Sequence, residues 1–334
     1  MVKGYISLAE ARASQAARLT AAARTIEDEV RAARSDGALS GEAPVFVGIG
    51  ASLAAAAPAV WTLRSRGIAA YRVNPGESPL PFPAGSASVI GVSQSGKSTE
   101  TLAALETVVP DRRMAVVNAA ISPMAAMAAI NVSLGGIPDS YASTIGYTAT
   151  LMALGMIVDA WNGGTIAGAW STAGALVRDL EDRLASRVGD LVAPLVDAHY
   201  VDCATASPSI GSAEAGSLLF REIARLPSTG FSTRQYLHGA MESAGKGTHV
   251  LMGDAREVEL ARMLARAGHD TIIVTSLAVD EERHLVHLTL PPSEPCVRPI
   301  LEAIVMQTLA VEAALARGLD PDAFVFQHDD TKVA

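Results

Sequence analysis

Residues 91–101 read GVSQSGKSTET, and they join an apolar strand predicted at 87–92 to a helix predicted at 98–109. The first eight letters fit the P-loop pattern G-x-x-x-x-G-K-S/T, in the strand–loop–helix context that this pattern requires. A junction of this kind points free backbone N–H groups and the positive end of a helix dipole at one place. We therefore predict that the loop binds phosphate.

The loop is richer in hydroxyl groups than a nucleotide-binding loop needs to be. Ser93, Ser95 and Ser98 fall within six residues, whereas polyphosphate loops use glycines that let the backbone wrap the ligand. Asp254 is the only loose candidate for an acidic residue that would hold magnesium, and it lies in the other half of the chain. A P-loop nucleotide-binding protein is therefore the less favoured alternative.

Short apolar strands and helices alternate on both sides of this loop, which predicts parallel sheets covered on both faces. In the first half we expect strands at 44–49, 68–73, 87–92, 114–118 and 131–134, and helices at 52–66, 98–109 and 123–128. In the second half we expect strands at 200–204, 248–252, 271–275 and 284–290, a strand-like stretch at 231–237, and helices at 212–226, 255–267 and 296–317. The repeated rhythm suggests an internal duplication.

The domain organisation follows from this rhythm. We expect an N-terminal helical segment at 1–40, opened by a capping box at residues 7–10, and a first domain at 41–188 that contains the phosphate-binding loop. Two long helices at 140–163 and 166–188 would end that domain. A second domain at 189–317 and an irregular tail at 318–334 complete the prediction.

The composition excludes several classes of protein. Against 35 Asp and Glu the chain has 26 Lys and Arg, so its net charge of −9 argues against a nucleic-acid partner. The most apolar run, 148–161, is shorter than the roughly 18 residues that a membrane-spanning helix needs. The first residues lack the apolar core of a signal peptide, and Cys203 and Cys296 are too few for a disulfide framework. We expect a cytoplasmic protein with neither a nucleic-acid nor a membrane partner.

Residues 93–101, SQSGKSTET, resemble the S-Q-S-G-x-S/T-x-D/E-T signature of sugar isomerase (SIS) domains. The pattern is most similar to the isomerase half of glucosamine-6-phosphate synthase, with the amino-sugar-phosphate deaminases and fructosamine deglycases beside it. The resemblance spans roughly residues 40–334 and implies an α/β fold of two tandem flavodoxin-like SIS domains, each a parallel sheet flanked by helices. Five further matches follow in the family's order: Gly50-Ala51-Ser52, Ala142-Ser143-Thr144, Arg221-Glu222-Ile223, Tyr236-Leu237-His238-Gly239 and Thr331-Lys332-Val333.

The resemblance implies an enzyme that binds a hexose or amino-sugar 6-phosphate and moves a proton between C1 and C2, as an aldose–ketose isomerase or an amino-sugar-phosphate deaminase. Glu222 would be the general base, His238 would open the sugar ring from the partner subunit of a homodimer, and Lys332 would close over the substrate. No metal or cofactor is implied. The residues expected to contact the phosphate or the sugar are Ser52, Ser93, Gln94, Ser95, Ser98, Ser143 and Thr144.

Plainer alternatives exist for several of these residues. The serines of the loop, and the Ser143-Thr144 pair, could serve only as helix N-caps, a position that hydroxyl residues favour. Glu222 could form an exposed ion pair with Arg225, three residues later on a helix. Lys332 could belong to a frayed terminus. We expect Lys97, which a P-loop would place on the phosphates, to be exposed to solvent.

Departures from the family pattern bear on the reaction. No glutaminase domain is present, so we expect no glutamine-dependent synthase. Leu219 stands where the synthase has a lysine one turn before the catalytic glutamate, while Ile145, Gln235 and Ala240 replace other characteristic residues. A non-catalytic sugar-phosphate sensor is the other alternative, although the 40 residues before the first strand are too short for a DNA-binding module.

Overall fold

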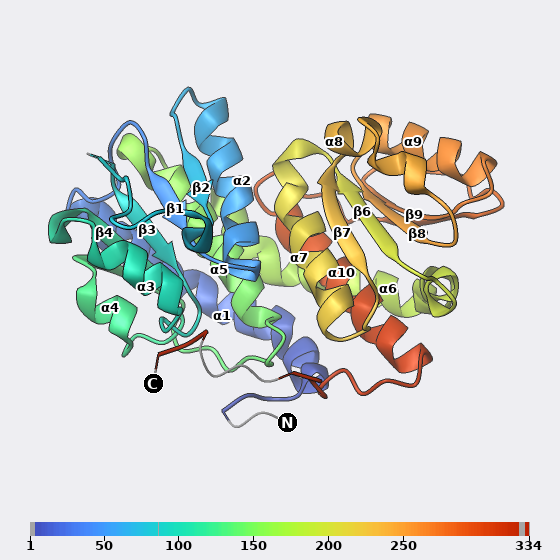
Figure 1. Ribbon diagram of the computed structural model, residues 1–334, viewed down its shortest axis with the longest axis horizontal. Helices are drawn as coiled ribbons and strands as arrows, with labels where there is room; N and C mark the ends of the chain where they lie inside the picture. The colour runs from blue at the N-terminus through green and yellow to red at the C-terminus, as the bar shows by residue number, and fades with distance from the viewer. Residues whose placement is uncertain (1–3, 86, 327–330, 334) are drawn as a thin grey trace. The chain divides into compact units, whose positions relative to one another are not determined.

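The computed structural model describes residues 4–85, 87–326 and 331–333. The chain folds as two compact units, Val2–Gly174 with Phe326–Ala334, and Ala175–Val325. Each unit contains one parallel five-stranded sheet with helices packed on it (Figure 1). The predicted fold class is thereby confirmed.

The sheet of the first unit has the order β2-β1-β3-β4-β5. All four neighbouring pairs are parallel, with Phe46 of β1 beside Ile90 of β3. The order changes direction between β1 and β3, so the connections that leave these two strands diverge. The strand bounds are β1 (Val45–Val47), β2 (Tyr71–Val73), β3 (Val89–Val92), β4 (Arg113–Val117) and β5 (Ile130–Ser133).

Helices cover both faces of this sheet (Figure 1). On one face α3 and α4 bury Leu105 and Met124 against Val89 and Ala115. Helices α1 and α2 pack on α5, which is almost entirely buried and contacts β4. The capping box predicted before α1 is present, since the Ser7 hydroxyl accepts from the Glu10 N–H. The helix bounds are α1 (Leu8–Ser35), α2 (Ala51–Ser65), α3 (Thr99–Glu106), α4 (Pro123–Met127) and α5 (Ile145–Ala160).

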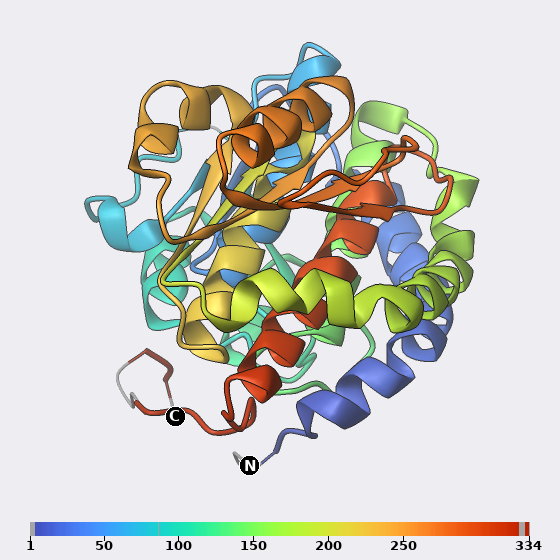
Figure 2. The ribbon, with the colours of Figure 1, turned by 90° about the vertical axis from the view of Figure 1, so that its right-hand side faces the viewer.

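The second unit repeats the topology of the first. Its sheet runs β10-β9-β8-β6-β7, which in chain order is the same arrangement as β2-β1-β3-β4-β5, again with all pairs parallel. In this unit (Figure 2), α9 packs on β8 and β9, and α7 packs on β6, β7 and α10. The strands are β6 (Val201–Thr205), β7 (Ser228–Ser232), β8 (Thr248–Met252), β9 (Asp270–Thr275) and β10 (Leu285–Thr289); the helices are α6 (Ala173–Val196), α7 (Ile210–Glu222), α8 (Thr233–Leu237), α9 (Ala255–Arg266) and α10 (Arg298–Ala316).

Several predicted elements differ from the structure in their bounds, and three of these differences have a clear local cause or change the type of element. The strand-like stretch 231–237 is the end of β7 followed by helix α8, because the Ser232 hydroxyl accepts from the Gln235 N–H and starts a helical turn. The helix predicted from 140 starts only at Ile145, after a turn that a carboxylate organises. The helix predicted at 166–188 is a 3₁₀ turn at Gly168–Thr172 followed by α6.

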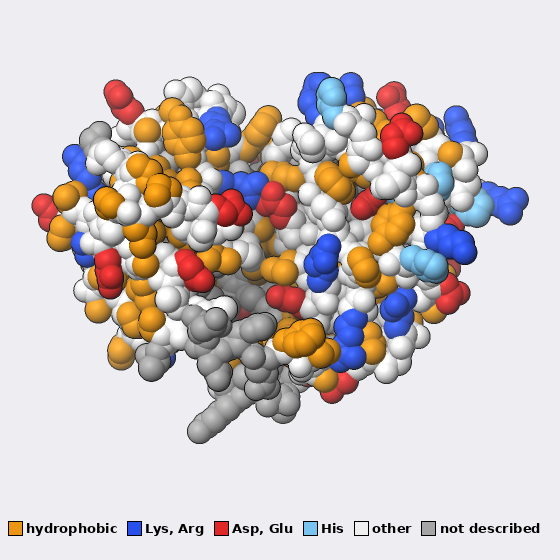
Figure 3. All heavy atoms as spheres, in the orientation of Figure 1, with side chains coloured by type: hydrophobic (Ala, Val, Ile, Leu, Met, Phe, Trp, Pro, Cys, Tyr) orange, Lys and Arg blue, Asp and Glu red, His pale blue; other side chains and the backbone are white. Residues whose placement is uncertain are grey.

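Helix α10 is long and apolar enough to cross a membrane by length and composition alone. Of the most apolar 18-residue stretch of this helix, 83% is buried within the structure, and the helix packs on α7. Its apolar character is therefore accounted for by its place in the core of the second unit. On the face drawn in Figure 3, acidic and basic side chains are interspersed among neutral ones.

Gly96 shapes the loop that follows β3. Its φ is +63°, and a Cβ there would lie 2.1 Å from Ser122 Oγ. The Gly96 N–H donates to the Ser93 carbonyl, and the Gly96 carbonyl accepts from the Met124 N–H, each at 3.1 Å. Only glycine fits this position, since it has neither the Cβ clash nor the penalty for positive φ.

We expect Gly96→Ala to destabilise the protein more than Gly67→Ala. Both glycines have positive φ, but nothing lies within 4 Å of a Cβ at Gly67. The two variants therefore share the backbone strain, and only the first adds the clash, worth roughly 1–3 kcal/mol. Chemical denaturation measures the difference in unfolding free energy. Equal losses in the two variants would contradict this account of the loop.

Candidate functional site

A cavity of about 660 Å³ lies at the carboxyl edge of the first sheet. Its walls come from the segments that follow β1, β3, β4 and β5, together with residues near both ends of the chain. In open α/β sheets, ligands bind where the strand order changes direction, and here that point lies between β1 and β3. The polar residues that line the cavity include Tyr5, Ser52, Ser93, Gln94, Ser95, Ser98, Asn118, Asp139, Tyr141, Thr331 and Lys332.

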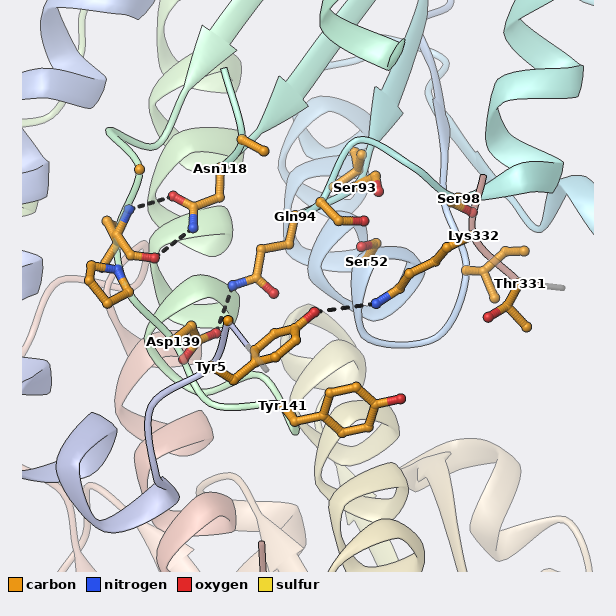
Figure 4. A pocket seen from close by; sticks show the side chains of 18 residues that line it. Tyr5, Ser52, Ser93, Gln94, Ser98, Asn118, Asp139, Tyr141, Thr331 and Lys332 are labelled. Atoms are coloured by element: carbon orange, nitrogen blue, oxygen red, sulfur yellow. Dashed lines mark hydrogen bonds between the residues drawn. The ribbon is translucent and has the colours of Figure 1, made fainter. Parts of the chain in front are cut away.

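Hydrogen-bond donors without partners converge on this cavity. Ser93 is 6% exposed, and within the described residues neither its hydroxyl nor that of Ser52 makes a hydrogen bond. The backbone N–H groups of Gln94, Ser95 and Ser98 likewise have no partner in the described part of the chain. Figure 4 shows Ser52, Ser93 and Ser98 around the same space. Such a set suits an anion with several acceptor oxygens.

Ser98 does not act as a side-chain cap, although α3 begins directly after it. Its hydroxyl instead accepts a hydrogen bond from Thr101 Oγ1 at 3.0 Å and lines the cavity. Ser98 thus occupies the N-cap position of α3 without a side-chain capping hydrogen bond. Lys97 is half-buried and does not line the cavity, so its side chain is not where a P-loop lysine would be.

The tail brings Lys332 to the cavity. Residues 331–333 run antiparallel to the loop, since the Thr99 N–H donates to Thr331 and the Val333 N–H donates to Lys97. Lys332 Nζ lies 3.4 Å from the Tyr5 hydroxyl and about 6 Å from the ring centres of both Tyr5 and Tyr141 (Figure 4). A cation over aromatic faces at this distance is attracted to them. The rest of the tail at 327–330 and 334 lies outside the described residues.

Asp139 organises the wall opposite the tail. Its carboxylate accepts from the backbone N–H groups of Thr144, Ile145 and Gly146 at 3.0–3.2 Å, which satisfies the first turn of α5. It also accepts from the hydroxyls of Ser143 at 2.8 Å and Thr144 at 2.9 Å. Ser143 and Thr144 therefore do not line the cavity, where the resemblance had placed them, because their hydroxyls turn to Asp139.

Two amide side chains extend this network. Gln94 Nε2 donates to Asp139 Oδ2 at 2.7 Å. Asn118, directly after β4, forms two hydrogen bonds with the backbone of Ile137, at 2.7 and 2.8 Å, and thereby holds the loop that carries Asp139.

Sequence reasoning missed Tyr5, Asn118, Asp139 and Tyr141. A polar residue directly after a strand was the available signal for Asn118, and an acidic residue shortly before a predicted helix was the signal for Asp139. The two tyrosines had no comparable signal, because their role depends on where the chain ends meet.

Glu222 is the last residue of α7 in the second unit and is half-buried. Burial raises the pKa of its carboxyl to about 7, and no hydrogen bond or ion pair of the described residues reaches it. The alternative of an ion pair with Arg225 is not seen among the described residues, where the Arg225 guanidinium donates to the Ala323 carbonyl at 3.2 Å. Leu219, one turn earlier, is buried.

His238 follows α8 in the second unit and is exposed, next to Gly239 with its φ of +122°. The residues that line the cavity belong to the first unit, whereas Glu222 and His238 belong to the second. Among the described residues, no group of three or more His, Cys, Asp and Glu side chains could hold a metal ion.

The fold matches solved structures over nearly the whole chain. The C-terminal domain of glucosamine-fructose-6-phosphate aminotransferase from Francisella tularensis aligns with a TM-score of 0.78 at 15% identity, covering 96% of this chain and 99% of that one. Tagatose-6-phosphate ketose/aldose isomerase from Escherichia coli gives 0.77 at 16% identity, with 97% and 96% covered. Glucosamine-6-phosphate deaminase from Thermotoga maritima gives 0.73 at 17% identity, with 93% and 97% covered.

No protein-family model matches the sequence, and no curated protein matches it as a relative. At these identities the solved structures establish the fold alone. The fold expected from the resemblance to sugar isomerase domains is confirmed.

We expect the double variant Ser93→Ala/Ser95→Ala to lose affinity for inorganic phosphate, while Lys97→Ala keeps it. Each hydrogen bond to a charged group contributes about 1.5–3 kcal/mol, and Lys97 does not line the cavity. Isothermal titration calorimetry measures the affinities, and circular dichroism checks the fold. If Lys97→Ala abolished binding and the serine variant did not, the P-loop alternative would be favoured.

Proposed function

We propose that this chain is an enzyme that binds a hexose or amino-sugar 6-phosphate and moves a proton between C1 and C2 of the sugar. The observation that supports this proposal most is a set of hydroxyl and backbone donors at the carboxyl edge of the first sheet that have no partner among the described residues. Three solved structures with this fold are named as a ketose/aldose isomerase, a deaminase and an aminotransferase of sugar 6-phosphates, which supports the same class of substrate.

The phosphate would occupy the loop between β3 and α3. Ser93, Ser95 and Ser98 would donate from their hydroxyls or backbone N–H groups, and Ser52 would donate from the start of α2. Lys332 would add a positive charge from the other side of the cavity, where Tyr5 and Tyr141 hold it. The P-loop alternative is less well supported, because Lys97 does not line the cavity.

Glu222 would be the general base. Isomerisation passes one proton from carbon to carbon through the base, by way of an enediolate, and one proton from the hydroxyl oxygen to the former carbonyl oxygen, so no atom or charge is gained or lost. A carboxylate with a pKa of about 7 suits this task, since a base is most effective when its pKa lies near the working pH. The absence of a hydrogen-bond partner in the described residues leaves its oxygens free for the transferred proton.

His238 would open the sugar ring as an acid–base group donated by the partner subunit of a homodimer. Its exposed position after α8 is compatible with that role. We propose a cytoplasmic enzyme that uses no metal or cofactor, and one that forms no imine at position 219, where leucine offers no amine.

We expect Glu222→Gln to lower turnover by about 10²–10⁴-fold while leaving ligand affinity nearly unchanged, because the base acts on the reaction and the loop supplies most of the binding. In the wild type, the rate should rise with pH to a midpoint near 7, as the carboxyl ionises, and this rise should be absent from the variant. Steady-state kinetics with fructose 6-phosphate and glucosamine 6-phosphate measure both effects. Equal turnover in the two proteins would exclude Glu222 as the base.

The same variant should change the pH dependence of stability. The pKa of Glu222 is raised from an ordinary 4.5 to about 7 in the folded state, so between these pH values the folded state holds the proton more tightly. The unfolding free energy of the wild type should therefore fall relative to Glu222→Gln as pH rises through this window. Thermal melts of both proteins at pH 4.5 and 8 test this expectation. If the difference in stability between wild type and variant were the same at both pH values, the raised pKa of Glu222 would be contradicted.

A further inference from the structure

The hydrogen bonds of Asp139 decide which way the Gln94 amide faces. Asp139 Oδ2 accepts from Ser143 Oγ, from the Gly146 N–H and from Gln94 Nε2, while Oδ1 accepts from Thr144 and Ile145. A carboxylate has no hydrogen to donate, so only the NH₂ end of a glutamine amide can face it. The Gln94 carbonyl oxygen must then face the other way.

That other direction is the cavity. Figure 4 shows the carbonyl oxygen of Gln94 turned away from Asp139 and towards the space between Ser52, Tyr5 and Lys332. No hydrogen bond from the described residues reaches this oxygen, and Gln94 lines the cavity. The side chain therefore presents an acceptor to a bound molecule.

Gly146 closes the space behind the amide. A Cβ at this position would lie 1.9 Å from Gln94 Nε2 and 2.6 Å from Asp139 Oδ2. The amide thus packs against the backbone of α5 and has no room for an additional methyl group. The hydrogen bond and the close packing together restrict Gln94 to one orientation.

We infer that Asp139 is a positioning residue that fixes Gln94 as a hydrogen-bond acceptor for the sugar, so that this side chain reads a hydroxyl or amino group of the substrate rather than the phosphate. The inference rests on the proposed function and deepens it, since the sequence placed Gln94 among the residues that contact the phosphate or the sugar without deciding between them. An oxygen acceptor would repel a phosphate dianion, whereas sugar hydroxyl and ammonium groups are donors.

The test compares fructose 6-phosphate with inorganic phosphate by calorimetry. Gln94→Met should weaken the affinity for fructose 6-phosphate about tenfold, equivalent to about 1.4 kcal/mol. The affinity for inorganic phosphate should stay within about twofold of the wild-type value. Gly146→Ala should give the same pattern, because its methyl group displaces the amide. The double variant Gly146→Ala/Gln94→Met should bind no more weakly than Gln94→Met alone.

Gly189→Ala is the matched control. Gly189 lies inside α6 with nothing within 4 Å of an added Cβ, so both affinities should be unchanged. If Gly146→Ala fails to fold, Asp139→Asn replaces it. The asparagine oxygen can still accept from Thr144 and Ile145 in the place of Oδ1, and an NH₂ in the place of Oδ2 would face Gln94 at the cost of the hydrogen bond from Gly146. That NH₂ would favour the reversed Gln94 amide and weaken the binding of fructose 6-phosphate selectively.

Equal losses for both ligands in Gln94→Met would overturn the inference, because they would mean that the amide donates to the phosphate. Additive losses in the double variant would also overturn it. If the wild type bound neither ligand, the proposed function would fail together with the inference. If the wild type bound both ligands and Gln94→Met lost affinity for both equally, only the inference would fail.

Discussion

The site depends on one constraint: a parallel sheet exposes backbone donors where its strand order changes direction, and those of the loop after β3 have no partner among the described residues. The connections after β1 and β3 diverge there and expose the start of α2 and the loop before α3. Gly96 holds that loop against Ser122, and Asp139 holds the opposite wall by capping α5. The cavity is thus built by backbone geometry first and by functional side chains second.

The second unit shows that this topology alone does not make a phosphate site. At the equivalent edge, Asp254 follows β8 and pairs with Arg298 at 2.7 Å, while buried Glu302 contacts the same guanidinium at 2.8 Å. Burial by itself would raise the pKa of Asp254, but hydrogen bonds from Arg298 and Ser276 hold it well below its usual range. An anion at this edge would have to compete with Asp254 for the Arg298 guanidinium, which Asp254 and Glu302 already contact. At this edge of the second unit the charged groups are paired with each other, whereas in the first unit the described loop after β3 leaves backbone donors without a partner.

Much of this could be predicted from the sequence, and the remainder depended on contacts between distant residues. Short apolar runs in the sequence predicted the positions of nine of the ten strands. The hydroxyl-rich sequence of the loop after β3 predicted where the cavity lies. The predicted position of strand β7 was too far along the chain, because Ser232 caps a helix that begins at residue 233. Ser143 and Thr144 were assigned to the sugar pocket because a motif records residue types and not the Asp139 carboxylate to which they turn. Tyr5 and Lys332 meet from opposite ends of the chain, which no local pattern encodes.

We propose that the loop between β3 and α3 binds the phosphate of a sugar. The most direct measurement is a crystal structure of the protein with fructose 6-phosphate. We expect the phosphate to lie within hydrogen-bonding distance of Ser93, Ser95 and Ser98, with the sugar extending towards Gln94 and Lys332. A phosphate bound outside this cavity, or beside the Lys97 side chain, would contradict it.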